Sequence, residues 1–474
     1  MKPKFGNDLT TGSIPKHLMN FSIPMLISSL LQTGYGIINT IWVGNMVGAN
    51  AVGATQVSFP IQFLLIALAT GATLSTTILV SQYFGAGNHD MVEKVVQNSL
   101  SIALIFGAFL TVAGLLSCDE ILRLMNTPAE IFGMASGYLK ITLAGFILMF
   151  LINLITSILR GIGDTKTPLI FMGVGLLINA ILDPLLIIGI GPFPKLGLNG
   201  AAYASLVAQF AGLMASIVYL NRKQHFVRVD FKKLTLQKEL VLQIAKLGFP
   251  TMIQQSLVSV GAAFITGFVN HFGAGATAAF GSAGRLEGVI FMPALSFSMA
   301  ASALAGQNLG AGKRERVKEV FKWGIIITSA VTFVLSAIIV AFPRLLLSMF
   351  VHETDVLDIG VGYLRILGPA YIIFAIMLIP NGILNGAGKT MVTMVFSLIS
   401  LWAVRVPLAA LLSGSALGIK GIWFSIDIGF AVGAATSLIY YFNGNWKDSA
   451  LIRPVKEGTP IEEYTPINGG EGQF

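Results

Sequence analysis

Charged residues are scarce in this sequence. Asp, Glu, Lys and Arg make up 11% of the 474 residues, whereas 54% of the residues are hydrophobic. A typical soluble domain is about 25% charged, so this composition excludes a protein whose whole surface faces water. The formal net charge is +8, but no basic block is interleaved with aromatic residues and no nucleic-acid-binding motif occurs. We therefore expect no nucleic-acid partner.

Cysteine, histidine and phosphate-binding motifs are also lacking. Cys118 is the only cysteine, which excludes an intramolecular disulfide bond and a cluster of thiolate ligands. None of the 5 histidines lies in a predicted membrane span. The glycine-rich runs near Gly85 and Gly310 lack the GxxxxGK[ST] spacing of a nucleotide-binding loop. The sequence therefore predicts neither an enzyme nor a site for a metal or an organic cofactor.

The sequence contains instead twelve apolar runs, each long enough to cross a bilayer. A spanning helix needs about 20 mostly apolar residues. The first run has no clear cleavage site, so we expect a retained helix and not a removed signal peptide. The predicted spans are 19–44, 52–80, 97–117, 136–159, 168–190, 200–220, 243–269, 277–303, 320–342, 360–384, 391–412 and 421–443. The expected fold is all-α, with twelve transmembrane helices in a lipid bilayer.

Lys and Arg predict the orientation, because they are retained on the cytoplasmic side. With the N-terminus inside, 22 of the 30 Lys and Arg lie in cytoplasmic segments and their helix ends. We therefore expect both termini on the cytoplasmic side of a cell membrane, plasma or inner. The most basic connection, residues 222–239, lies at the midpoint of the chain. The expected parts are an N-terminal six-helix lobe (1–225), a cytoplasmic linker (226–242), a C-terminal six-helix lobe (243–444) and a polar tail (445–474).

The two halves of the sequence repeat. The spacing is 225 residues through most of the repeat, then shortens to 223 and finally to 221. Matched pairs are Gly48 and Gly273, Gln82 and Gln307, Gly161 and Gly386, Pro184 and Pro407, and finally Gly197 and Gly418. Because each half has an even number of predicted spans, the two lobes should share their orientation and be related by a pseudo-twofold axis along the membrane normal.

Several motifs recur in a specific order along nearly the whole chain. They are Gln82–Gly87, its repeat Gly306–Gly312, Arg160–Pro168, Asn179–Pro184 and residues 197–202. Together they resemble the multidrug and toxic compound extrusion (MATE) family. The resemblance implies a secondary antiporter that exports small organic compounds, often cationic, in exchange for H⁺ or Na⁺ through a cleft between two six-helix bundles. We expect a monomer with no cofactor besides the coupling ion.

Charged residues inside a membrane are costly, so each of them is a candidate functional residue. They are Asp183, Arg285, Glu287, Arg405 and Asp427. Arg285 and Glu287 are two residues apart and do not face each other on a helix. We expect Arg285, Arg405 and Asp427 to form structural charge pairs, with Arg405 neutralising Glu287 or Asp427. Glu287 is open to a second interpretation, as a cleft residue or a second cation site.

Asp183 is the main candidate for cation coupling. Pro184 lacks a backbone donor and disfavours helical geometry at the residue before it, and Asn179 lies on the same helix face. Their oxygens suit Na⁺, or the carboxylate alone takes up a proton. Asn39 is expected to face this site, where the MATE family often has an acidic residue. The alternative is that Asn179 and Asp183 satisfy backbone freed by a kink and that Asn39 only joins helices.

Other functions remain open on the sequence alone. A lipid-linked saccharide flippase of related architecture would need a more cationic cavity, whereas the spans contain three acids and two bases away from their ends. A membrane-embedded enzyme would need catalytic residues that the spans lack. A channel would share the helices but not the carrier mechanism.

Overall fold

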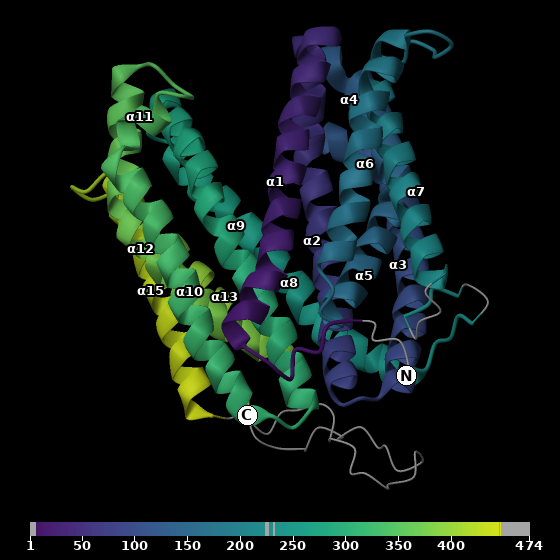
Figure 1. The fold of residues 1–474 in the computed structure, drawn as a ribbon. Coiled ribbons are helices and arrows are strands. Elements are labelled where there is room, and N and C mark those ends of the chain that lie inside the picture. The colour runs from purple at the N-terminus through teal and green to yellow at the C-terminus, as the bar shows by residue number, and fades with distance from the viewer. Residues whose placement is uncertain (1–5, 223–226, 231–232, 445, 447–474) are drawn as a thin grey trace, which may run out of the picture. The chain divides into compact units, whose positions relative to one another are not determined.

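The computed structural model describes residues 6–222, 227–230, 233–444 and 446 (Figure 1). Every regular element in this part of the chain is a helix. The helices are α1 Ile14–Met46, α2 Ala49–Gly85, α3 His89–Leu124, α4 Ala129–Ala144, α5 Phe146–Gly161, α6 Lys166–Pro184, η1 Leu185–Gly189, α7 Leu198–Arg222, α8 Lys238–Asn270, α9 Ala274–Gly310, α10 Arg314–Ala341, α11 Pro343–Leu347, α12 Thr354–Gly386, α13 Thr390–Ser397, η2 Leu398–Arg405, α14 Val406–Ser413 and α15 Ile419–Asn443. The predicted polar tail lies outside the described residues, except Trp446.

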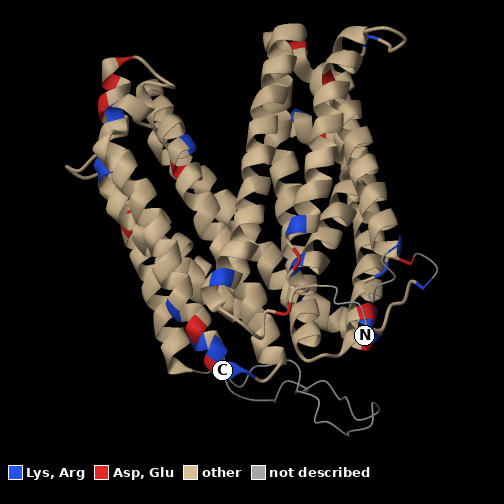
Figure 2. Cartoon of the chain, in the orientation of Figure 1, with Lys and Arg blue, Asp and Glu red and all other residues tan. Residues whose placement is uncertain are grey.

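The predicted membrane spans match these helices. Eleven helical stretches among the described residues are long and apolar enough to cross a membrane, and α4 with α5 makes a twelfth. The predicted span 136–159 falls within this pair, in which α4 and α5 meet at a bend of 43° that the sequence did not indicate. Gly145 lies at this junction, and glycine is a weak helix former. Long stretches of helix carry no charge (Figure 2), so the chain is an all-α, multi-pass membrane protein.

The helix around Pro184 differs from the expected kink. Asp183 stays within α6, and Pro184 has ordinary helical angles of φ −63° and ψ −34°. The backbone changes only after the proline, where five residues form the π-helix η1. The prediction that Pro184 breaks helical geometry at Asp183 is therefore wrong. The missing N–H of Pro184 removes a bond to the carbonyl four residues earlier, on the N-terminal side, so the proline does not by itself account for η1.

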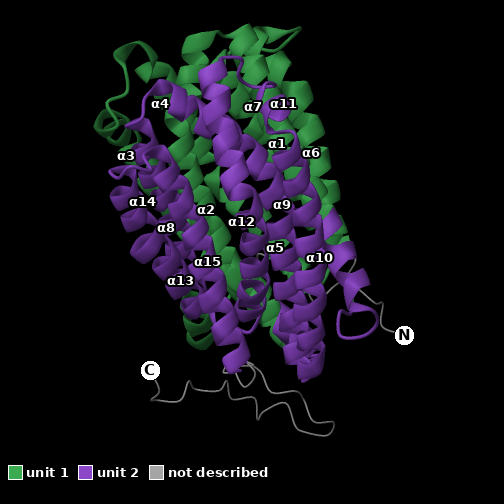
Figure 3. Cartoon of the chain, turned by 90° about the vertical axis from the view of Figure 1, so that its left-hand side faces the viewer, with its two compact units in different colours: residues 1–7, 24–80, 89–246 green, residues 8–23, 81–88, 247–474 purple. Residues whose placement is uncertain are grey.

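The chain forms two compact units, and each of them combines segments from different parts of the sequence (Figure 3). Unit 1 contains residues 1–7, 24–80 and 89–246, and unit 2 contains 8–23, 81–88 and 247–474. Helix α8 begins at Lys238, inside the predicted linker 226–242. The pseudo-twofold relation of the two lobes stays a prediction.

The N-terminal segment joins unit 2 through its backbone. The N–H of Leu9 donates to Gln307 Oε1 at 3.0 Å, and its carbonyl accepts from Asn308 Nδ2 at 3.2 Å. Lys313 Nζ donates to the carbonyl of Thr10 at 2.9 Å. The side chain of Leu9 is also buried. These bonds explain why a segment at the start of the chain packs with helices from its second half.

Four glycines of the repeat end helices in the same way. Each has a positive φ, between 71° and 82°, which L side chains rarely adopt. They are Gly87, Gly163, Gly312 and Gly388. In each turn the N–H of the following residue returns to a carbonyl five residues earlier, for example Asn88 to Tyr83 at 3.0 Å. This is the Schellman pattern of a helix C-terminus, so the motif glycines form tight turns and not a phosphate-binding loop.

Candidate functional site

Asp183 lies at the centre of a polar group in unit 1. Its side chain is fully buried. Asn179, one turn earlier in α6, donates Nδ2 to Asp183 Oδ1 at 3.1 Å. Asn39 of α1 donates Nδ2 to Asp183 Oδ2 at 3.1 Å. The structure thus brings together the three residues proposed for cation coupling, whereas their coupling role stays a prediction.

Two further residues complete the group and were not identified from the sequence. Tyr35 OH donates to Asp183 Oδ2 at 3.3 Å and accepts from Asn39 Nδ2 at 3.0 Å. Ser205 Oγ lies 3.5 Å from Asn179 Oδ1 and 3.4 Å from Tyr35 OH. Tyr35 is four residues before Asn39 and so lies on the same face of α1. Helical periodicity could therefore have pointed to Tyr35 once Asn39 was placed at the site. No pattern in the sequence pointed to Ser205.

The site contains an anion without a fixed counter-ion. Among the residues that the structure describes, no Lys or Arg forms an ion pair with Asp183. Its hydrogen-bonding neighbours Asn39, Asn179 and Tyr35 are neutral. A buried ionised carboxylate is costly unless it is paired. The arrangement therefore favours uptake of one positive charge, as a bound monovalent cation or as a proton.

The charged residues of unit 2 form a second group. Tyr363 OH of α12 donates to Glu287 Oε2 of α9 at 3.1 Å. The guanidinium of Arg405, at the end of η2, lies 4.5 Å from the centre of the Phe430 ring. Arg405 also interacts electrostatically with Glu287 and with Asp427 of α15. These residues lie against a buried core that includes Tyr363, Phe430 and neighbouring aromatic rings.

The charge pairs expected of Arg285, Arg405 and Asp427 are not direct ion pairs in the described part of unit 2. Neither Arg285, Arg405 nor Asp427 forms an ion pair within 4.0 Å there. Arg285 is exposed, and its guanidinium lies 5.5 Å from the Phe350 ring. Arg405 interacts with Glu287 and Asp427 beyond the distance of an ion pair. Its planar guanidinium stacks on the face of the Phe430 ring, a geometry that suits this cation.

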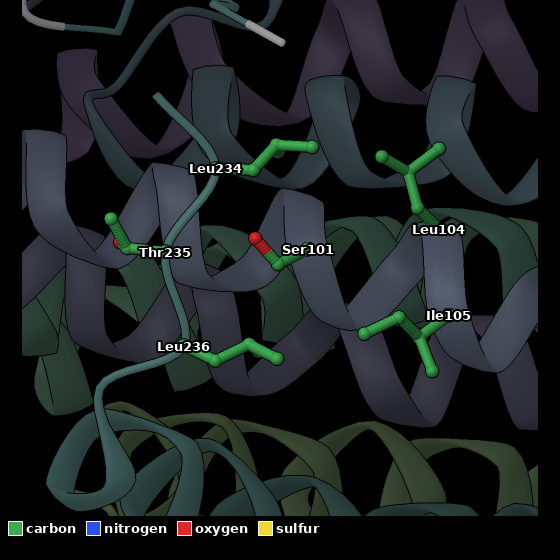
Figure 4. A pocket seen from close by; sticks show the side chains of 6 residues that line it. All are labelled: Ser101, Leu104, Ile105, Leu234, Thr235 and Leu236. Atoms are coloured by element: carbon green, nitrogen blue, oxygen red, sulfur yellow. The ribbon is translucent and has the colours of Figure 1, made fainter. Parts of the chain in front are cut away.

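One pocket lies away from both groups. It is formed by α3 and the segment before α8, and Figure 4 shows its lining side chains, Ser101, Leu104, Ile105, Leu234, Thr235 and Leu236. Asn98 holds this segment, because its Oδ1 accepts from the N–H of Gln237 at 2.6 Å. None of the residues that line this pocket belongs to the group around Asp183.

Comparison with known proteins identifies the family. The sequence model of the MatE family matches residues 24–185 and 250–411, one match in each half. The chain belongs to the MATE family. Probable multidrug resistance protein YoeA of Bacillus subtilis is 34% identical to this MATE protein, over 94% of this chain and 96% of the relative. The FAD transporter of Shewanella oneidensis is 28% identical over 90% of this chain and 94% of the relative.

A solved structure supports the same assignment for the fold. It is described as the outward-facing conformation of a multidrug resistance MATE family transporter of the MOP superfamily. It superposes with a TM-score of 0.86 at 25% identity and covers 93% of this chain and 98% of its own. The resemblance found from the motifs and the all-helical, two-bundle fold are therefore confirmed. This MATE protein is a membrane transporter and not an enzyme.

Proposed function

We propose that this MATE protein exports small organic compounds by antiport, and that Asp183 carries the coupling cation, H⁺ or Na⁺. The buried, uncompensated carboxylate of Asp183 is the observation that carries the proposal. A relative of 34% identity is described as a probable multidrug resistance protein, which supports drug export. The neutral Asn39 leaves one acid in this group, so one monovalent charge is enough to balance it.

We further propose that the exported compounds are organic cations. Away from the ends of the spans there are three acids and two bases, and this excess of acids favours organic cations over anions. The FAD transporter of 28% identity shows why this class needs a direct test, because FAD carries phosphate groups. A lipid-linked saccharide flippase is the less favoured candidate, because its pyrophosphate would need a more cationic site.

The proposal is tested in proteoliposomes with the full chain and a fluorescent organic cation. An imposed H⁺ or Na⁺ gradient should drive the dye against its own gradient, and each ion is tested alone. Unlabelled organic cation on the opposite side should produce counterflow, because a carrier exchanges substrates and a channel does not. Failure of both gradients to drive the dye would contradict antiport, and transfer of a lipid-linked saccharide instead would favour the flippase.

The proposed orientation, with both termini in the cytoplasm, is tested by cysteine labelling. Cys118 is fully buried and should give little background. Single cysteines at the exposed positions Asn45 and Pro194 are expected to react with an impermeant maleimide in intact cells. A cysteine at the exposed Lys233 should react only after permeabilisation. The opposite pattern would overturn the positive-inside argument.

A further inference from the structure

The connection that precedes α8 is held beside α3 by side-chain hydrogen bonds. Gln97 Nε2 donates to the carbonyl of Arg228 at 3.2 Å. Asn98 Nδ2 donates to Thr235 Oγ1 at 3.4 Å, and Asn98 Oδ1 accepts from the N–H of Gln237 at 2.6 Å. The pocket of Figure 4 lies within unit 1 and has two walls, α3 and this connection, which polar groups hold in place.

Apolar side chains line most of this pocket, whose volume is about 240 Å³. Figure 4 shows Leu234 and Leu236 reaching from the connection toward Leu104 and Ile105 of α3. Ile105 is 59% exposed and Leu236 is 55% exposed. Ile105 also lies inside the predicted membrane span 97–117. Exposed apolar side chains at this depth contact the acyl chains of lipids and not water.

The face of α3 that borders the pocket changes from basic to apolar along the helix. Lys94, Asn98, Ser101 and Ile105 are spaced by three or four residues, so they lie along one face. Lys94 is exposed at the start of this row, before the predicted span begins. Lys238, the first residue of α8, directly follows the connection and is also exposed. Two basic groups therefore adjoin the polar end of an apolar pocket, in the order of head group and acyl chain in a phospholipid.

Only part of the positive charge in this region is neutralised. Residues 222–239 contain six Lys and Arg but only two acids. Glu93 of α3 pairs with Lys233 of the connection at 3.5 Å. Among the residues that the structure describes, Lys94 and Lys238 form no ion pair. These two lysines are therefore available to an anionic group beside the pocket.

The second half of the chain does not repeat this combination. At the repeat spacing of 225 residues, Lys94 corresponds to Glu319 and Asn98 to Trp323, both in α10. An acid and an indole cannot supply the basic group and the amide that holds the connection. The pocket with its lysines is therefore a feature of the first half and not a requirement of the repeated helix bundle.

We propose that this pocket binds an acyl chain of an anionic phospholipid from the cytoplasmic leaflet, with Lys94 and Lys238 at the phosphate. Lys and Arg at the cytoplasmic ends of membrane helices attract anionic lipids, and the apolar walls give the acyl chain a fixed place beside α3. The same positive charge disfavours an exported organic cation here. The inference rests on the proposed cytoplasmic orientation of this face and not on antiport or on Asp183.

Native mass spectrometry of the purified full chain tests the proposal. Phosphatidylglycerol and phosphatidylcholine with identical acyl chains are titrated separately, and the apparent Kd of the first bound lipid is measured. Each basic residue near the phosphate strengthens binding by a factor of about five, so phosphatidylglycerol should bind on the order of tenfold more tightly. Lys94→Gln combined with Lys238→Gln should remove most of this preference. Equal binding of the two lipids to the parent chain would overturn the proposal.

Matched variants separate this pocket from a general attraction of lipid. Lys318→Gln combined with Lys322→Gln removes two exposed lysines from α10 and should leave the preference unchanged. Leu236→Gln keeps every charge but makes the apolar wall polar, so it should weaken phosphatidylglycerol binding several-fold. Leu124→Gln, at an 82% exposed position of α3, should not. The pocket assignment is wrong if the pocket variants bind this lipid like the parent chain, or if the controls weaken binding equally.

The unaltered chain covers the case in which a variant does not fold. Phosphatidylglycerol with a photoreactive diazirine in its acyl chain is bound to the full chain and crosslinked, and the labelled peptides are identified. Labels are expected on residues 101–105 and 234–236, and unlabelled phosphatidylglycerol should compete better than phosphatidylcholine. Labels found only elsewhere, or displacement of the probe by an organic cation, would show that the pocket is not a site for an anionic lipid.

Discussion

Asp183→Asn is expected to abolish gradient-driven export while the protein still folds. Asn keeps the size of Asp and its hydrogen bonds with Asn39 and Asn179 remain possible, but the charge that a coupling cation needs is lost. An ion that no longer binds one state better than another cannot shift the transport equilibrium. Uptake of an organic cation into inverted vesicles should fall on the order of tenfold or more, to the level without a gradient. Expression and Tm report folding.

Two variants of the same polar group serve as controls. Tyr35→Phe removes one hydrogen bond to Asp183 and keeps the carboxylate, so it should reduce coupled transport far less than Asp183→Asn. Asn39→Asp places a second acid beside Asp183 and should preserve folding while changing the dependence of transport on pH or Na⁺. If Asp183→Asn exported like the parent chain under the same gradient, the coupling role would be wrong, and Glu287 would become the next candidate.

Gly310→Ala is expected to destabilise unit 2 strongly. A single Cβ at Gly310 would overlap the backbone of Gln82, and one at Gly85 would overlap the backbone of Gln307. The ends of α2 and α9 therefore touch backbone to backbone, where no flexible side chain can yield. Overpacking of this kind costs about 1–3 kcal/mol or more, so we expect the Tm to fall by roughly 5 °C.

Gly281→Ala is the matched control in the same helix. Nothing lies within 4 Å of a Cβ added at Gly281, and alanine is the better helix former by about 1 kcal/mol. Its Tm should therefore equal or exceed that of the parent chain in the same detergent. An equal Tm for Gly310→Ala would show that the close approach of α2 and α9 relaxes without cost.

The membrane helices could be predicted from the sequence because their signal is local. A run of about 20 apolar residues satisfies its backbone only as a helix in lipid, and the neighbouring sequence is enough to recognise it. The bend between α4 and α5 was missed, because Gly145 interrupts the helix without a charge or a proline to mark it. The helical state of Asp183 was also missed, since Pro184 permits more than one local geometry.

The partners of the charged residues needed the tertiary structure. The spacing of Asn179 and Asp183 on one helix follows from helical periodicity, but Ser205 comes from another helix with no pattern that points to this site. In the same way, the sequence suggested Glu287 or Asp427 as the partner of Arg405, but only the structure shows the ring of Phe430 beside its guanidinium. Contacts between distant helices depend on packing, which no local periodicity encodes.

The sequence by itself therefore determined the class of the protein, its twelve apolar runs, its internal repeat and its resemblance to the MATE family, because composition, hydrophobicity and motif order are properties of the chain. Only the tertiary structure decided which helices supply the neighbours of Asp183 and Arg405. It also showed that the segment at the start of the chain packs with unit 2. The physical reason is that hydrogen bonds and close packing act between atoms that folding brings together across hundreds of residues.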